Sequence, residues 1–139
     1  MVKGEVVLIE SPYGSEKISE VVRNICYARA CVRDSVIRGE FPLASHLFFT
    51  QPGILDDNIS EERQRGIDIG LAIGGLADRS AFYMYFGESR GMKYARDNAL
   101  KSGREIEERT LGDNWLKEYS DLARNHSQRD VWEKSCNLL

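Results

Sequence analysis

Few residues in this chain could build a disulfide framework, a metal site or a membrane segment. The 139 residues include 3 Cys, 2 His and 3 Pro, and no run of about 18 apolar residues occurs in the sequence. The chain also starts without the apolar core of a signal peptide. Cys26 and Cys31 lie on one expected helix and point about 140° away from each other. We therefore expect reduced thiols, no metal, no cofactor, no contact with membranes and a cytoplasmic protein.

An excess of one charge is missing as well. The chain carries 19 Lys and Arg against 22 Asp and Glu, a formal net charge of -3. No segment concentrates the basic residues that a protein needs to bind a phosphate backbone, so nucleic acid is a poor candidate partner. What is present, 42% hydrophobic and 29% charged residues, suits one folded domain with a single core.

Short apolar runs alternate with amphipathic stretches up to Leu111. Strand-like runs cover 5–11, 41–49, 80–86 and 106–111, and helical patterns cover 15–39, 58–77 and 92–103. Parallel strands joined by helices take right-handed crossovers. This order therefore predicts an α/β fold: a Rossmann-like three-layer sandwich with a mostly parallel sheet of roughly four or five strands, the first of them central.

Residues 112–139 differ from the α/β domain of residues 1–111 and are expected to form a helical extension of it. They contain Trp115 and Trp132 in two short amphipathic patterns, which cover either the open edge of the sheet or a neighbouring subunit. The glycines at 66, 70 and 74 leave a bare stripe on the second helix, which indicates close packing against the sheet or a symmetry mate. We expect a homo-oligomer, at least a dimer.

Ligands of open α/β sheets bind beyond the carboxyl ends of the strands. The loop before the third helix contains Ser89, Arg90, Gly91 and Met92, whose hydroxyl, guanidinium and backbone N–H groups suit a phosphate or carboxylate. The other loops at this edge add further candidates for ligand binding, which are Glu10, Ser11, Tyr13, Gly14, Ser45, His46, Glu62 and Arg63.

Several of these candidates have two interpretations. Glu10 either faces the ligand or accepts hydrogen bonds from neighbouring loop N–H groups. His46 either contacts a base or forms a structural hydrogen bond. Tyr13 could stack on a ring or close the pocket, and Glu62 and Arg63 either reach the ligand or pair with each other.

Four segments carry a resemblance to a known family. They are Glu-Ser-Pro-Tyr-Gly after the first strand, and the segments 27–47, 51–67 and 77–92, which contain Phe-Pro-Leu-Ala-Ser-His-Leu, Gln-Pro-Gly-Ile-Leu-Asp-Asp and Gly-Glu-Ser-Arg-Gly-Met. Residues 5–111 resemble an uncharacterised family common in phages and bacteria. That family is similar to the nucleoside 2-deoxyribosyltransferases and to their relative, the deoxynucleoside-monophosphate N-glycosidase.

The resemblance also reveals a departure. In the transferases a Ser-x-Gly element opens the third helix, and a Glu six residues after the Ser attacks the anomeric carbon. Ser89 and Gly91 match this element, but the position of the Glu is taken by Ala95. Asp97 lies about 200° further round the helix and is expected to face solvent.

The resemblance therefore implies a protein that binds a nucleotide or nucleoside derivative in a degenerate pocket without efficient turnover. In a phage, such a protein would sequester a nucleotide immune signal, for instance an ADP-ribose derivative, in the cytoplasm of the infected host. Two alternatives stay open. The first is an active N-glycosidase or deoxyribosyltransferase that uses Glu10 or Glu88, and the second is a structural oligomer with an empty crevice.

Overall fold

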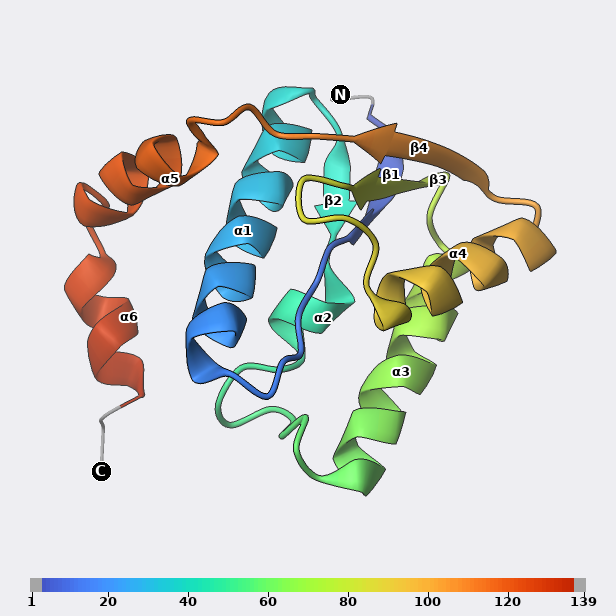
Figure 1. Ribbon diagram of the computed structural model, residues 1–139, viewed down its shortest axis with the longest axis horizontal. Helices are drawn as coiled ribbons and strands as arrows, with labels where there is room; N and C mark the ends of the chain where they lie inside the picture. The colour runs from blue at the N-terminus through green and yellow to red at the C-terminus, as the bar shows by residue number, and fades with distance from the viewer. Residues whose placement is uncertain (1–3, 137–139) are drawn as a thin grey trace.

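The computed structural model describes residues 4–136, and its centre is a four-stranded parallel sheet (Figure 1). The strands are β1 (Val6–Glu10), β2 (Phe41–Leu43), β3 (Arg79–Tyr83) and β4 (Glu105–Arg109), in the order β2-β1-β3-β4. All three pairings are parallel, with Val6 opposite Phe41 and Glu10 opposite Phe82. The expected Rossmann-like sheet with a central first strand is confirmed.

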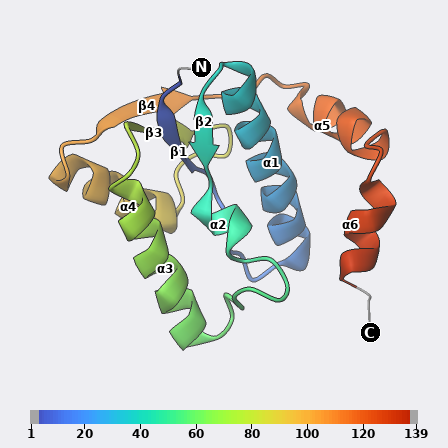
Figure 2. The same cartoon turned by 180° about the vertical axis from the view of Figure 1, so that it is seen from behind.

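Helices cover both faces of this sheet. The helix α1 (Ile18–Ile37) lies on one face, and α3 (Ser60–Gly74) and α4 (Arg90–Lys101) lie on the other (Figures 1 and 2). Side chains alternate between the faces of a strand. Val7 and Ile9 of β1 pack with Tyr27 of α1 in the core, so Leu8 and Glu10 belong to the face that α3 and α4 cover.

One expected strand is shorter than its apolar run. Only Phe41–Leu43 is a strand, and Ser45–Phe48 forms the short helix α2. The carbonyl of Ala44 accepts hydrogen bonds from the N–H groups of Leu47 and Phe48, which closes a helical turn. The prediction of a strand to Phe49 was wrong because the period of a short apolar run does not separate a strand from a buried helix.

The C-terminal extension consists of α5 (Trp115–Arg124) and α6 (Arg129–Ser135). Trp115 is 6% exposed and joins the core, where its ring contacts Tyr27 and Phe86 with centroid distances of 5.2 and 6.0 Å. Both helices lie on the outer side of α1 (Figure 2). In α6, Trp132 stays 58% exposed, so only the first of the two tryptophans packs into the described part of its own chain.

The glycine stripe of α3 does not pack against the strands of the sheet. A Cβ atom at Gly70 would lie 3.1 Å from Ser45 Oγ, and one at Gly74 would lie 3.2 Å from the Arg104 guanidinium. The stripe therefore lets α2 and Arg104 approach α3. The three cysteines within 4–136 are free thiols, and no helix in this range is long and apolar enough to cross a membrane.

Candidate functional site

The residues that the sequence predicted to bind a ligand line one cavity. It has a volume of about 1450 Å³ and lies between the loop after β1, α2 and the loop that follows it, α3 and the start of α4. Its lining includes all twelve candidates for ligand binding, namely Glu10, Ser11, Tyr13, Gly14, Ser45, His46, Glu62, Arg63, Ser89, Arg90, Gly91 and Met92.

The sheet topology explains why these loops converge. The chain leaves β1 toward β2 on one side, and the later strands β3 and β4 add to the other side. The helices on the two sides therefore cover opposite faces, and a crevice opens at the carboxyl ends of β1 and β3, the switch point where such folds bind ligands. Gly66 and Gly70 of α3 also line the cavity, so the glycine stripe widens it.

Glu10 is the last residue of β1 and lines this cavity. No residue within 4–136 forms a hydrogen bond with its carboxyl group. Burial disfavours the charged form of a carboxyl group and raises the pKa of Glu10 from 4.5 to about 7, although the nearby positive charge of Arg104 partly offsets this rise. The interpretation in which loop N–H groups satisfy Glu10 is therefore wrong.

Arg104 is a residue of the cavity that sequence reasoning missed. Its Nε donates a hydrogen bond to Ser80 Oγ, and its Nη1 donates one to the carbonyl of Gly74, both at 2.8 Å. These bonds fix the guanidinium on the wall of the cavity. Because Arg104 precedes β4 and reaches the site through contacts with β3 and α3, no local pattern around it could have indicated this role.

His46 forms a hydrogen bond with Ser11, and both residues line the cavity. Its Nε2 lies 2.7 Å from Ser11 Oγ. Burial lowers the pKa of His46 from 6.5 to about 4, so the imidazole is neutral at pH 7 and has one N–H donor and one acceptor nitrogen. The pair joins the loop after β1 to α2, and a neutral imidazole suits contact with an uncharged ring.

The amino end of α4 lies at the same cavity. Ser89 is the N-cap, and its Oγ accepts a hydrogen bond of 3.2 Å from the N–H of Met92. That N–H group is therefore already occupied, contrary to the expectation that it binds an anion. The backbone N–H groups of Arg90 and Gly91 and the exposed Arg90 guanidinium form no hydrogen bond with other residues of 4–136, which leaves them for a negatively charged ligand.

The structure also shows how the other residues named in the sequence analysis lie relative to the cavity. Glu88 does not line the cavity, since its carboxylate lies 2.6 Å from Arg96 Nε and forms an ion pair with it. Ala95 lines the cavity, whereas Asp97 is exposed and lies outside it. Among the described residues, Glu62 and Arg63 form no ion pair with each other. The structure therefore leaves Glu10 as the carboxylate that reaches the cavity from the end of a strand.

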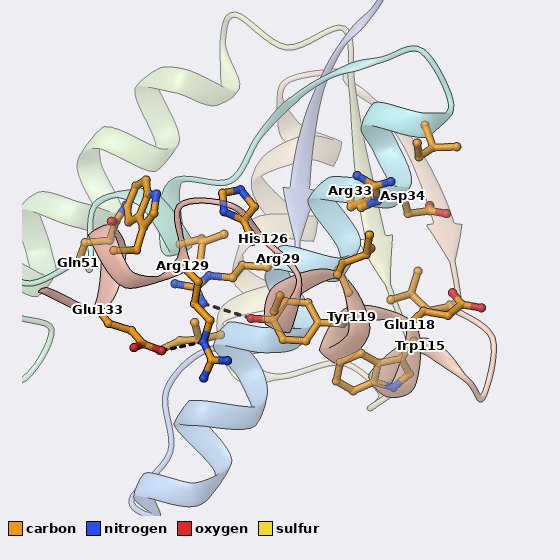
Figure 3. Close-up of a pocket in the computed structure, with 18 of the residues that line it drawn as sticks. Arg29, Arg33, Asp34, Gln51, Trp115, Glu118, Tyr119, His126, Arg129 and Glu133 are labelled. Atoms are coloured by element: carbon orange, nitrogen blue, oxygen red, sulfur yellow. Dashed lines mark hydrogen bonds and ion pairs between the residues drawn. The ribbon is translucent and has the colours of Figure 1, made fainter. Parts of the chain in front are cut away.

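A second cavity, of about 1190 Å³, lies between α1 and the C-terminal helices (Figure 3). Arg29 Nη1 donates a hydrogen bond of 3.2 Å to the Tyr119 hydroxyl, and Arg129 Nε pairs with Glu133 at 2.8 Å. None of the twelve candidates lines this groove. No group of three or more His, Cys, Asp or Glu side chains within 4–136 could hold a metal ion.

The fold and the first cavity define a Rossmann-like α/β domain with a cleft of mixed polar and apolar lining at its topological switch point. Residues 5–109 match the family described as a domain of unknown function, DUF7768, and the chain belongs to this family. No curated protein and no solved structure shows significant similarity to the chain.

Proposed function

We propose that this protein binds a nucleoside or nucleotide derivative in the cavity at the ends of β1, β2 and β3. The convergence of the candidate residues on one cavity carries the proposal. Ligand pockets commonly measure about 300–1,000 Å³, so this cavity has room for a base, a sugar and a phosphate. Its mixed lining, with the neutral His46, the carboxyl group of Glu10 and the aromatic Tyr13, suits a ligand of this kind.

The amino end of α4 supports the anionic part of the proposal. A phosphate or an equivalent group would accept hydrogen bonds from the free N–H groups at Arg90 and Gly91 and from the Arg90 guanidinium. Charge-assisted bonds of this type are worth about 1.5–3 kcal/mol each. The favoured ligand is therefore a nucleotide rather than a neutral nucleoside.

Binding without efficient turnover is the form of this function that we favour. In the deoxyribosyltransferases, which this sequence resembles, a Glu on the third helix attacks the sugar, and this chain has Ala95 at that position. A cavity that keeps its binding groups but lacks the nucleophile retains ground-state affinity and loses the covalent step. Such a protein would suit the sequestration of a nucleotide signal, including one that a phage must remove from its host.

An N-glycosidase or deoxyribosyltransferase is the second candidate function, and Glu10 is the observation that favours it. A carboxyl group with a pKa of about 7 can act as a general acid or base at neutral pH. A structural homo-oligomer with an empty crevice is the third candidate, and the exposed Val131 and Trp132 of α6 would suit its subunit contacts. At least a dimer is expected in sedimentation.

The experiment that tests the proposal is an untargeted mass scan of the small molecules that heat releases from the purified protein. We expect an intact nucleotide or nucleotide derivative. Chromatography of deoxynucleoside monophosphates, nucleosides and ADP-ribose after long incubation with the protein tests for turnover. Free base that forms with wild type and not with Glu10→Gln would overturn binding without turnover and favour the enzyme.

A further inference from the structure

Glu10 differs from the other carboxylates that lie in or near the core. Glu40 accepts hydrogen bonds from Arg109 and Ser35, and Glu88 accepts one from Arg96. Glu10 has no such donor within 4–136, although it lies at the end of the central strand. The Glu10 side chain is partly buried and lines the cavity, so its carboxyl group is accessible to a ligand and is not held by a residue of the described chain.

The surroundings of Glu10 do not supply the missing donor. Arg104, whose positive charge lowers the pKa of Glu10, donates from Nε to Ser80 and from Nη1 to Gly74 and forms no hydrogen bond with Glu10. His46 forms its hydrogen bond with Ser11. The carboxyl group thus lines the cavity without a hydrogen bond to any residue within 4–136, and a ligand in this cavity can replace water as its donor.

The charges in the cavity also orient an anionic ligand. A phosphate is favoured at the amino end of α4, where Arg90 and backbone N–H groups lie, and it is repelled by Glu10. Arg104 beside Glu10 partly offsets this repulsion. The other carboxylates that line the cavity, which also disfavour a phosphate, are Glu16, Asp56, Asp57 and Glu62. The part of the ligand that meets Glu10 is therefore uncharged or carries N–H donors. The edge of a nitrogen heterocycle has this chemistry, because it presents ring nitrogens and amino groups that can bond to both oxygens of a carboxyl group.

We propose that Glu10 is the specificity-determining residue of this cavity, and that its carboxyl group binds the nitrogen heterocycle of the ligand while the amino end of α4 holds the anionic group. This inference rests on the proposed nucleotide-binding function and adds the orientation of the ligand. A site that is built to hydrogen-bond a ligand rejects an analogue that lacks the bonding group, because its own polar group is then left unpaired.

The test uses calorimetric titration of the full chain with AMP, GMP, CMP, UMP, ADP-ribose and ribose 5-phosphate, the last of which has no base. The variants are Glu10→Leu, which removes the hydrogen-bonding group at similar size, Glu10→Gln, which fixes one donor and one acceptor, and Arg90→Ala. Glu61→Gln, on an exposed part of α3 outside the cavity, is the control. Thermal unfolding verifies that each variant folds.

We expect Glu10→Leu to weaken the tightest base-containing probe about tenfold or more and to leave ribose 5-phosphate unchanged. Glu10→Gln should alter the order of preference among the four monophosphates, and Arg90→Ala should weaken all phosphate-containing probes alike. The proposed role of Glu10 would be wrong if Glu10→Leu bound every base-containing probe as wild type does, or if it lost as much affinity for ribose 5-phosphate as for the base-containing probes. Either result would leave the proposed nucleotide binding intact. If no probe binds wild type, the proposed function itself is wrong.

Discussion

Two groups of polar side chains lie beside the same sheet and differ in their hydrogen bonds. The first, which we name the Arg109 network, comprises Arg109, Glu40, Glu107 and Tyr83. The Arg109 side chain is 2% exposed and bonds Glu40 at 2.6 Å, Glu107 at 3.0 Å and the Tyr83 hydroxyl at 3.1 Å. The second group is Glu10 with its neighbours Arg104 and His46 in the cavity.

The two groups differ in whether their carboxylates accept hydrogen bonds from neighbouring side chains. Hydrogen bonds from Arg109 lower the pKa values of Glu40 and Glu107, so both carboxylates stay charged and paired. Glu10 accepts no hydrogen bond within 4–136, the charge of Arg104 only partly compensates its burial, and its pKa rises to about 7. The network joins β3 and β4 to Glu40, which directly precedes β2, and its carboxylates are paired, although Arg109 Nε has no hydrogen-bond partner within 4–136. By contrast, a carboxyl group that lines a cavity without a hydrogen-bond partner is a feature of binding and catalytic sites. We therefore assign structure to the first group and function to the second.

The largest expected effect is a loss of stability on substitution of Arg109, which tests the structural role of the Arg109 network. Arg109→Ala would leave Glu40 and Glu107 without their shared partner, and breaking such a buried pair costs about 3–5 kcal/mol of unfolding free energy. Urea denaturation at pH 7 measures this loss. Arg65→Ala, at an exposed position of α3, is the control and should change little. A loss below about 1 kcal/mol would show that the network does not stabilise the fold.

The next largest expected effect is a gain in stability rather than a loss. The pKa of Glu10 is raised in the folded protein, so stability is lost as pH rises from 4.5 to about 7. Glu10→Gln removes this cost and should stabilise the protein at pH 8 by at most about 3 kcal/mol. At pH 4 both states bind the proton, and the gain should vanish. Urea denaturation at both pH values measures the difference, and a destabilised variant at pH 8 would contradict the account.

His46 should show a smaller effect with the reverse dependence on pH. Its pKa is depressed from 6.5 to about 4, so the stability that it contributes is lost as pH falls through this range. His46→Gln should cost about 1 kcal/mol at pH 7, where the bond with Ser11 is lost. This cost should be smaller at pH 5, because the buried imidazole resists protonation and the wild-type protein is then itself less stable. A cost that grows at pH 5 would contradict the assignment.

The smallest effect concerns a paired carboxylate just outside the cavity. Glu88→Gln removes the ion pair with Arg96 and should cost about 0.5–1 kcal/mol of stability, as is typical of partly exposed pairs. Because Glu88 does not line the cavity, calorimetry should show unchanged nucleotide binding. A clear loss of affinity would move Glu88 into the site and weaken the distinction between paired and unpaired carboxylates.

The sequence was most informative about the sheet and the loops at its edge. Apolar runs separated by helical patterns are local, and they predicted four strands that overlap β1, β2, β3 and β4, although the second run continues into α2. The central first strand followed from the order of strands and helices. The rule that ligands of open α/β sheets bind beyond the carboxyl ends of the strands led us to place the loops of Glu10, His46 and Ser89 at one edge. A cavity lined by all twelve candidates followed from that arrangement.

Contacts between distant segments could not be predicted in this way. Arg104 reaches the cavity because Gly74 leaves room for its guanidinium and Ser80 accepts its Nε–H, and these residues belong to three different elements. The glycine stripe was identified, but its partners were not. The N–H of Met92 was expected to be free, whereas the hydroxyl of its own N-cap Ser89 occupies it, a competition that a motif does not reveal.

The most direct test of the central claim, a nucleotide-binding cavity, is calorimetric titration of wild type, Arg90→Ala and Arg65→Ala with the nucleotide that heat releases from the protein. We predict measurable binding to wild type and to Arg65→Ala, and affinity lower by about tenfold or more for Arg90→Ala, since one charge-assisted hydrogen bond is lost. Equal affinity of all three proteins, or no binding to wild type, would contradict the claim.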